Sequence, residues 1–228
     1  MSSGRRAGLH TMRELIVNTF LTLDGVMQAP GGPEEDPSDG FEHGGWSFGY
    51  WDQQMGEAMG DFMGKPFDLV LGRKTYEIFA AHWPHSQEEG AAELNAATKH
   101  VASTTLTQLT WQNSRLIEGD VPAGVRALKE QDGPELQVHG SATLLQTLIR
   151  HGLVDQFNVW TFPVVLGKGK RLFGDGTVAE GLELVDSKVS STGVIMATYR
   201  TGAEIKSGSF ALEEPTEAEL ERRAKQSG

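Results

Sequence analysis

The stretch LVLGRKTYE at residues 69–77 joins a short apolar run to a helical pattern through a single glycine. Phe67–Leu71 is mostly apolar, as expected of a buried strand, and Gly72 ends it. Thr75–Ala81 then has the spacing of a helix. A strand that turns directly into a helix is the repeating unit of a parallel sheet, and ligands bind outside the carboxyl ends of such strands.

The same arrangement recurs at VHGSAT, residues 138–143. Glu135–Val138 is predicted as a strand, and the leucines and isoleucine of LLQTLI, residues 144–149, form one apolar helix face that Gly152 ends. The unpaired N–H groups at a helix N-terminus bind phosphates, and glycine lets a ligand approach the backbone. Taken singly, each turn is equally consistent with ordinary turn and cap residues.

Outward from these turns, strands and helices alternate along the chain. Further strands are predicted at residues 13–20, 99–103, 115–117 and 154–162, and further helices at residues 46–63 and 121–131. Glu183–Val189 and Val194–Arg200 are predicted to form an antiparallel hairpin. The pattern predicts one α/β domain at residues 13–200, with a mostly parallel sheet covered on both faces. Residues 1–12 are predicted to be a disordered leader, and residues 201–228 a charged tail or surface helix.

Composition excludes several classes of function. The net charge is −11, and ten acidic residues but no Lys or Arg lie between Glu14 and Gly64, which argues against nucleic-acid binding. No cysteine is present, so thiolate chemistry and Cys-ligated metals are excluded. The histidines lack metal-ligand spacing. No apolar run is long enough for a membrane span, and no secretory signal is present, so we expect a cytoplasmic protein.

Four segments in order resemble the dihydrofolate reductase superfamily, and in particular its riboflavin-biosynthesis reductase branch. Residues 69–77, followed by Trp83-Pro84, look like the G-R-x-T-[YW]-E segment, and TLDGV at residues 22–26 resembles the S-L-D-G-x loop. VHGS at residues 138–141 matches the second glycine turn. Residues 162–173 are similar to the P-x-x-x-G-x-G-x-x-L-F segment. The resemblance implies a three-layer α/β/α sandwich over residues 13–200, without the zinc deaminase domain of the bifunctional enzymes.

The resemblance further implies that NADPH lies across the sheet. Arg73 would hold the 2′-phosphate, because a guanidinium forms paired bonds with phosphate oxygens, and Ser103 and Thr104 would lie near the adenosine. The residues implied around the pyrophosphate and nicotinamide are Phe20, Val26, Met27, Gly72, Lys74, Thr75, Gly140, Ser141, Ala142, Leu144 and Leu145. The long Gly- and Pro-rich loop at residues 21–45 would close over the nicotinamide and exclude water.

The substrate side departs from the pattern. Dihydrofolate reductases anchor the pterin through a carboxylate on the first helix, where this chain offers Asp52, Glu57 and Asp61, and spacing does not choose among them. Asp61 and Asp24 are the catalytic candidates. Asp24, Trp51, Phe162 and Gly167 are the substrate-binding candidates.

Two functions follow as expectations. The first is NADPH-dependent hydride transfer to a pterin-like or aminopyrimidine-like heterocycle, with no metal, nucleic acid or membrane as partner. The alternative is a non-catalytic protein that binds NADPH or a heterocycle on the same fold. We also expect a homodimer, because the apolar strands Val154–Phe162 and Val194–Tyr199 could extend or cover a sheet edge.

Overall fold

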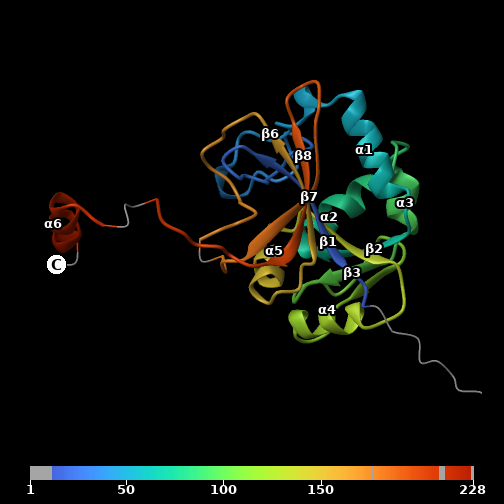
Figure 1. The fold of residues 1–228 in the computed structure, drawn as a ribbon. Coiled ribbons are helices and arrows are strands. Elements are labelled where there is room, and N and C mark those ends of the chain that lie inside the picture. The colour runs from blue at the N-terminus through green and yellow to red at the C-terminus, as the bar shows by residue number, and fades with distance from the viewer. Residues whose placement is uncertain (1–11, 176, 211–213, 227–228) are drawn as a thin grey trace, which may run out of the picture.

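The computed structural model describes residues 12–175, 177–210 and 214–226, so the expected leader lies almost wholly outside the described residues. Eight strands form one sheet in the order β4-β3-β2-β5-β1-β6-β8-β7 (Figure 1). Their bounds are β1 Leu15–Thr22, β2 Phe67–Gly72, β3 Lys99–Ala102, β4 Ser114–Leu116, β5 Glu135–His139, β6 Gln156–Phe162, β7 Gly181–Val189 and β8 Ile195–Ala203. The first six strands pair in parallel, whereas β8 pairs antiparallel with β6 and β7, as predicted.

Helices cover both faces of the sheet, which confirms the three-layer sandwich. The helices are α1 Gln53–Met63, α2 Arg73–His82, α3 Ala91–Ala96, α4 Val121–Lys129, α5 Ala142–Arg150 and α6 Glu217–Gln226. On one face, α4 and α5 pack through Val125, Leu145 and Leu148 against the sheet. On the other face, α1 packs through Met55 and α2 through Tyr76. Successive side chains of a strand point to opposite faces of the sheet, so apolar strands present an apolar surface on both faces, and helices cover each of them.

The helix predicted at residues 46–63 is shorter than expected. Residues 48–50 form a 3₁₀ turn, and α1 begins only after Asp52, whose side chain accepts a hydrogen bond of 2.9 Å from the Met55 N–H. The second carboxylate oxygen of Asp52 accepts from the Ser191 N–H and hydroxyl in the β7–β8 turn. Asp52 therefore begins the helix and ties it to the C-terminal hairpin. Sequence reasoning missed α3 altogether.

The strands expected to lie at a sheet edge are interior. β6 lies between β1 and β8, and β8 lies between β6 and β7. The edge strand next to them is β7, which is exposed along most of its length. In the predicted tail, α6 buries no residue, as expected of a surface helix.

Candidate functional site

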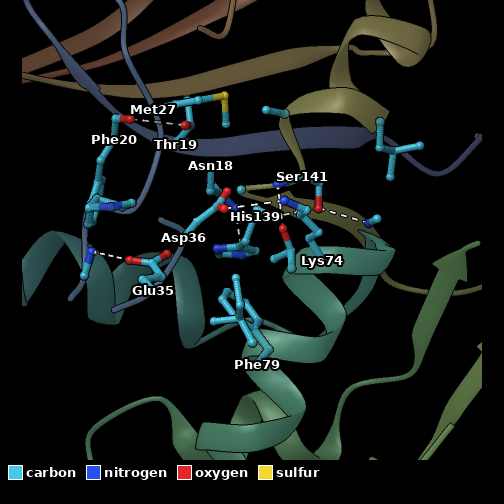
Figure 2. Close-up of a pocket in the computed structure, with 18 of the residues that line it drawn as sticks. Asn18, Thr19, Phe20, Met27, Glu35, Asp36, Lys74, Phe79, His139 and Ser141 are labelled. Carbon is cyan, nitrogen blue, oxygen red and sulfur yellow. Dashed lines mark hydrogen bonds and ion pairs between the residues drawn. The ribbon is translucent and has the colours of Figure 1, made fainter. Parts of the chain in front are cut away.

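A cavity of about 1760 Å³ lies at the carboxyl ends of β1, β2, β5 and β6, between α1 and α2 (Figure 2). Pockets for one small ligand enclose about 300–1,000 Å³. The cavity is therefore large enough for a dinucleotide and a second ligand side by side.

Two helices begin at one end of this cavity. Gly72 precedes α2, and Ser141, at φ +59°, precedes α5; neither helix has a side-chain cap. The residues of their first turns, 73–75 and 142–144, line the cavity. Uncapped N–H groups carry partial positive charge, so the junctions β2–α2 and β5–α5 together form a site for an anion.

The two junctions are locked to each other by side-chain hydroxyls. The Gly72 N–H donates to Ser141 Oγ at 3.0 Å, and the Ser141 N–H donates to Thr75 Oγ1 at 2.8 Å. Gly140 lies between them at φ +55°, where a Cβ would stand 3.1 Å from Thr75 Oγ1. Glycine at this position therefore keeps the conformation free of strain and leaves the hydroxyl in place.

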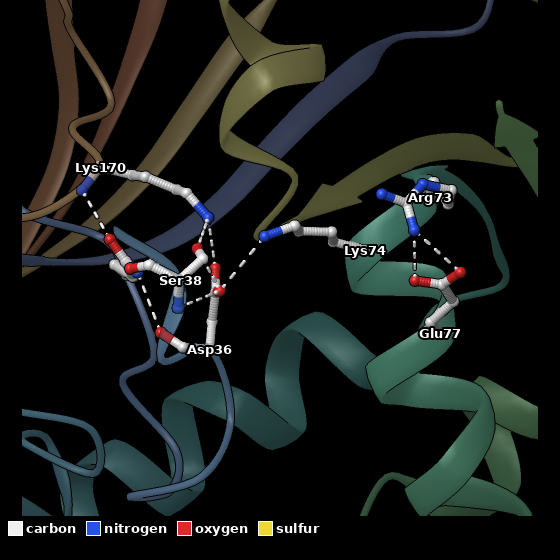
Figure 3. Close-up of polar contacts among 7 residues, drawn as sticks. Asp36, Ser38, Arg73, Lys74, Glu77 and Lys170 are labelled. Carbon is white, nitrogen blue, oxygen red and sulfur yellow. Dashed lines mark hydrogen bonds and ion pairs between the residues drawn. The ribbon is translucent and has the colours of Figure 1, made fainter. Parts of the chain in front are cut away.

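Two basic side chains of the cavity, Lys74 and Lys170, lie around a single acid, Asp36 (Figure 3). Lys170 donates to Asp36 and Ser38, and Lys74 Nζ lies 3.6 Å from Asp36 Oδ1. Burial raises the pKa of Asp36, but hydrogen bonds from Lys170 and Ser38 have the larger combined effect and lower it to about 2. Asp36 is thus a permanent anion that holds the loop after β1 close to α2.

Arg73 lies on the first turn of α2 and is half-exposed. Its guanidinium pairs with Glu77 one turn along the helix, at 2.9 Å. An exposed pair of this kind contributes little stability, so a phosphate can replace Glu77 as the partner of Arg73.

The opposite end of the cavity is aromatic. The Phe20 ring stacks on Trp160 with centroids 5.2 Å apart, and Trp51 lies 6.1 Å from Phe20. Met59 and Phe62 of α1 complete this apolar wall. The flat faces suit a planar heterocycle.

A polar row crosses the floor of the cavity between the two ends. Asn18 of β1 is in register with His139 of β5 and Asn158 of β6. Asn158 Nδ2 donates to Asn18 Oδ1 at 2.7 Å, and Gln137 Oε1 lies 3.0 Å from His139 Nε2. Burial lowers the pKa of His139 to about 4, so the imidazole is neutral at pH 7. Sequence reasoning did not single out this row.

Glu35 is the carboxyl of the aromatic end. Its Oε2 accepts from the Gly31 N–H at 2.6 Å and from the Gly32 N–H at 3.2 Å, in the tight turn of the loop after β1. Burial raises the pKa of Glu35 despite these hydrogen bonds. A carboxyl with a raised pKa inside a cavity is suited to proton transfer.

Most of the predicted site residues line this cavity. They are Phe20, Met27, Trp51, Gly72, Arg73, Lys74, Thr75, Ser103, Thr104, Gly140, Ser141, Ala142 and Leu144. Val26, Leu145 and Phe162 do not line it, because they are fully buried in the core. The two predicted glycine turns thus lie together at one cavity, whereas three apolar neighbours belong to the packing behind them.

Both carboxylates predicted to be catalytic lie elsewhere. Asp61 is exposed on α1 and is not part of the cavity lining. Asp24 accepts hydrogen bonds from the Leu166 and Gly167 N–H groups, at 3.2 and 2.8 Å, and from the Thr22 hydroxyl. These bonds, the Thr22 hydroxyl first, lower the pKa of Asp24. Asp24 and Gly167 therefore fasten two loops together behind the cavity and do not contribute to its lining.

Within the described ranges, no group of three metal-ligating side chains is positioned to hold a metal ion. In the same ranges, no helix combines the length and apolar character that a membrane crossing needs.

Comparison with known proteins places the chain in a defined group. The family described as RibD C-terminal domain matches residues 13–196. The uncharacterized protein YyaP of Bacillus subtilis strain 168 is 27% identical over 196 residues, which are 82% of this chain and 94% of that protein.

Two solved structures share the fold. A putative riboflavin biosynthesis protein from Shewanella sp. PV-4 aligns with a TM-score of 0.60 at 20% identity, over 83% of this chain and 99% of that one. Dihydrofolate reductase from Enterococcus faecalis, complexed with NADP(H), aligns with a TM-score of 0.51 at 16% identity, over 83% and 97% of the two chains.

Proposed function

The chain belongs to the RibD C-terminal domain family, and we propose that it is an NADPH-dependent reductase that transfers a hydride to a pterin-like or aminopyrimidine-like heterocycle. The observation that carries the proposal is the pair of uncapped helix N-termini at the junctions β2–α2 and β5–α5. They fit the pyrophosphate of a dinucleotide, since each offers N–H groups to a phosphate.

The residues that would hold NADPH follow from the contacts around this pair. The backbone of the first turns of α2 and α5 would hold the pyrophosphate at Thr75 and Gly140, while the hydrogen bonds of Gly72 and Ser141 keep the two turns in place. Arg73 would pair with the 2′-phosphate. When bound, NADPH supplies a hydride to an unsaturated carbon of the substrate ring.

The side chains at the aromatic end would hold and protonate the substrate. Phe20, Trp51 and Trp160 would hold the ring flat, which fixes the distance over which the hydride moves. Glu35 would deliver the proton that the adjacent ring nitrogen needs once the carbon has taken the hydride. A raised pKa keeps a proton on this carboxyl more readily than on an exposed glutamate.

One observation favours the alternative of a non-catalytic binding protein. No carboxylate of α1 lines the cavity, although dihydrofolate reductases anchor their substrate from this helix. The protein would then bind NADPH or a heterocycle without turnover. Stopped-flow measurement of bound NADPH separates the two: oxidation by at least one dihydropterin or diaminopyrimidinone supports the reductase, and tight binding without oxidation supports the binding protein.

We also propose that the protein is a homodimer. Support comes from the edge strand β7, whose side chains Leu182, Leu184, Val185 and Val189 are exposed. An exposed apolar edge strand readily pairs with another chain. Light scattering should give twice the 24.8 kDa of one chain, and a particle of one chain's mass would contradict the proposal.

A further inference from the structure

Charge is unevenly distributed over the cavity lining. Among the described residues, the lining holds seven carboxylates but only three Lys or Arg side chains. The carboxylates are Glu34, Glu35, Asp36, Glu88, Glu89, Glu93 and Asp120, and the bases are Arg73, Lys74 and Lys170. The charged side chains of the described lining therefore carry net negative charge, which disfavours an anion.

Each of the three bases already faces a carboxylate. Arg73 pairs with Glu77 at 2.9 Å, and both Lys74 and Lys170 are directed at Asp36 (Figure 3). Arg73 and Lys74 also lie on the first turn of α2, which the proposed function gives to the phosphates of NADPH. Lys170, the remaining base of the described lining, is held by Asp36 and Ser38, so little positive charge is left for an anionic group of a second ligand.

The two bases of α2 lie away from the aromatic end, and Lys170 is held by Asp36 and Ser38. Phe20 and Glu35 lie on the side of the cavity opposite Lys74 and Ser141 (Figure 2). The wall from α1 is uncharged, and consists of Gly56, Met59, Gly60, Phe62, Met63 and Gly64. The floor is the neutral row of Asn18, His139 and Asn158, which offers amide and imidazole groups to a ring.

The side of the cavity between α1 and α3 is acidic. Glu88, Glu89 and Glu93 line it and are exposed. Glu89 lies directly against α1, since a Cβ at Gly60 would stand 3.7 Å from its Oε1. A carboxylate tail that left the aromatic end on this side would pass three like charges, which repel it.

We propose that the substrate of this site is an uncharged, flat nitrogen heterocycle that carries neither a phosphate nor a carboxylate tail. The proposal rests on the proposed function for the position of NADPH. Neutral polar edges of the ring would face Asn18, His139 and Asn158, and its faces would lie against Phe20 and Trp160. Anionic relatives of the same ring would be excluded by the carboxylates.

The test uses the full chain loaded with NADPH and two matched pairs of compounds. The first pair is a diaminopyrimidinone with a ribosyl phosphate and the same compound without the phosphate. The second pair is dihydrofolate and dihydropterin, which differ in the glutamate-bearing tail. Binding is measured by quenching of tryptophan fluorescence, and NADPH oxidation is recorded separately.

We expect the uncharged member of each pair to bind at least about tenfold more tightly, because the carboxylates of the lining repel the anionic member. Equal or tighter binding of the anionic members would overturn the proposal. Absence of quenching by all four compounds would also overturn it. Fluorescence quenching reports binding whether or not NADPH is oxidised, so it tests the proposed substrate class. NADPH oxidation, recorded separately, tests the proposed function.

A charge-reversal variant sharpens the result. Glu88→Lys with Glu89→Lys should tighten binding of dihydrofolate by about threefold or more and leave dihydropterin unchanged, because only the tail meets these side chains. The matched control is Glu130→Lys with Glu180→Lys, two exposed positions outside the cavity lining. An equal effect of both double variants would mean that overall charge, and not the cavity, decides affinity.

Discussion

The two ends of the cavity are built in different ways. The end at α2 and α5 uses the backbone: N–H groups of two helix N-termini, a glycine at positive φ and the hydroxyls of Thr75 and Ser141. The aromatic end uses side chains, from β1, β6, α1 and the loop at residues 23–52. Backbone groups bind any phosphate in the same way, whereas side chains choose the ring. On the proposed function, the backbone end would bind the cofactor and the side chains of the aromatic end would choose the substrate.

The largest expected effect comes from the aromatic end. Glu35→Gln should lower kcat by about 10²-fold or more, the usual contribution of a general acid, with NADPH affinity nearly unchanged. The kcat of the parent should fall as pH rises through the raised pKa of Glu35, and that fall should be absent in the variant.

The control for this prediction is Glu42→Gln, an exposed acid of the same loop that does not line the cavity. Steady-state kinetics with a ring that the parent protein reduces gives kcat, and fluorescence titration gives the affinity for NADPH. An unchanged kcat in Glu35→Gln would remove Glu35 from the reaction.

The next effect concerns the backbone end and uses two glycines with nearly the same conformation. Gly140 has φ +55° and Gly152 φ +58°, but only Gly140 has close neighbours, at Thr75. Gly140→Ala should weaken NADPH binding by about 3 kcal/mol, roughly a hundredfold, because it displaces N–H groups that bind a charged phosphate.

Gly152→Ala should cost only the strain of the left-handed conformation, about 1–2 kcal/mol of the free energy of unfolding. Isothermal titration with NADPH and urea denaturation separate the two effects. Equal NADPH affinity in both variants would show that the turn at Gly140 does not touch the cofactor.

Arg73→Ala tests whether the base at the start of α2 selects the coenzyme. NADPH binding should weaken by about 1.5–3 kcal/mol, the scale of hydrogen bonds to a charged group, while NADH binding stays the same. Titration with both coenzymes measures the difference. Equal losses for NADPH and NADH would place the 2′-phosphate away from Arg73.

The smallest effect concerns the polar floor. Burial lowers the pKa of His139 to about 4, so the unfolded chain binds a proton at a higher pH than the folded chain does. As the pH is lowered from 6.5 to 4, the free energy of unfolding should therefore fall by about 1 kcal/mol for each pH unit. His139→Gln should remove this slope, while His100, whose pKa is also lowered, remains in both proteins.

Urea denaturation across this pH range gives the slope. Nitrogen NMR of the ring should show a neutral imidazole down to about pH 4. Titration of His139 near its ordinary pKa would mean that the floor is open to water.

The sequence predicted the backbone end because its signals are local. Each turn places Gly, Ser or Thr between a strand and a helix within six residues, as in VHGSAT at 138–143. The aromatic end has no such local signal. Asn18, His139 and Asn158 meet only through the register of β1 with β5 and β6. Asn18 and His139 are more than a hundred positions apart in the sequence.

Two of the acids that the sequence offered for the substrate side, Asp24 and Asp52, hold the structure together instead. In the sequence, Asp24 and Asp52 cannot be told apart from an acid that faces a ligand. In the structure, both accept hydrogen bonds from backbone N–H groups and hold distant segments together. Glu35, which does line the cavity, follows a tight turn at Gly31 and Gly32. Only the folded loop distinguishes a carboxylate that holds the structure from one that faces a ligand.

Hydride transfer from NADPH to a ring carbon is the direct test of the proposed function. NADPH deuterated at the transferable position is bound to the protein and mixed with an uncharged dihydropterin or diaminopyrimidinone. The account predicts loss of NADPH absorbance, slowed by the deuterium, and one deuterium on a ring carbon of the product. Tight NADPH binding with no deuterium in any ring would contradict it.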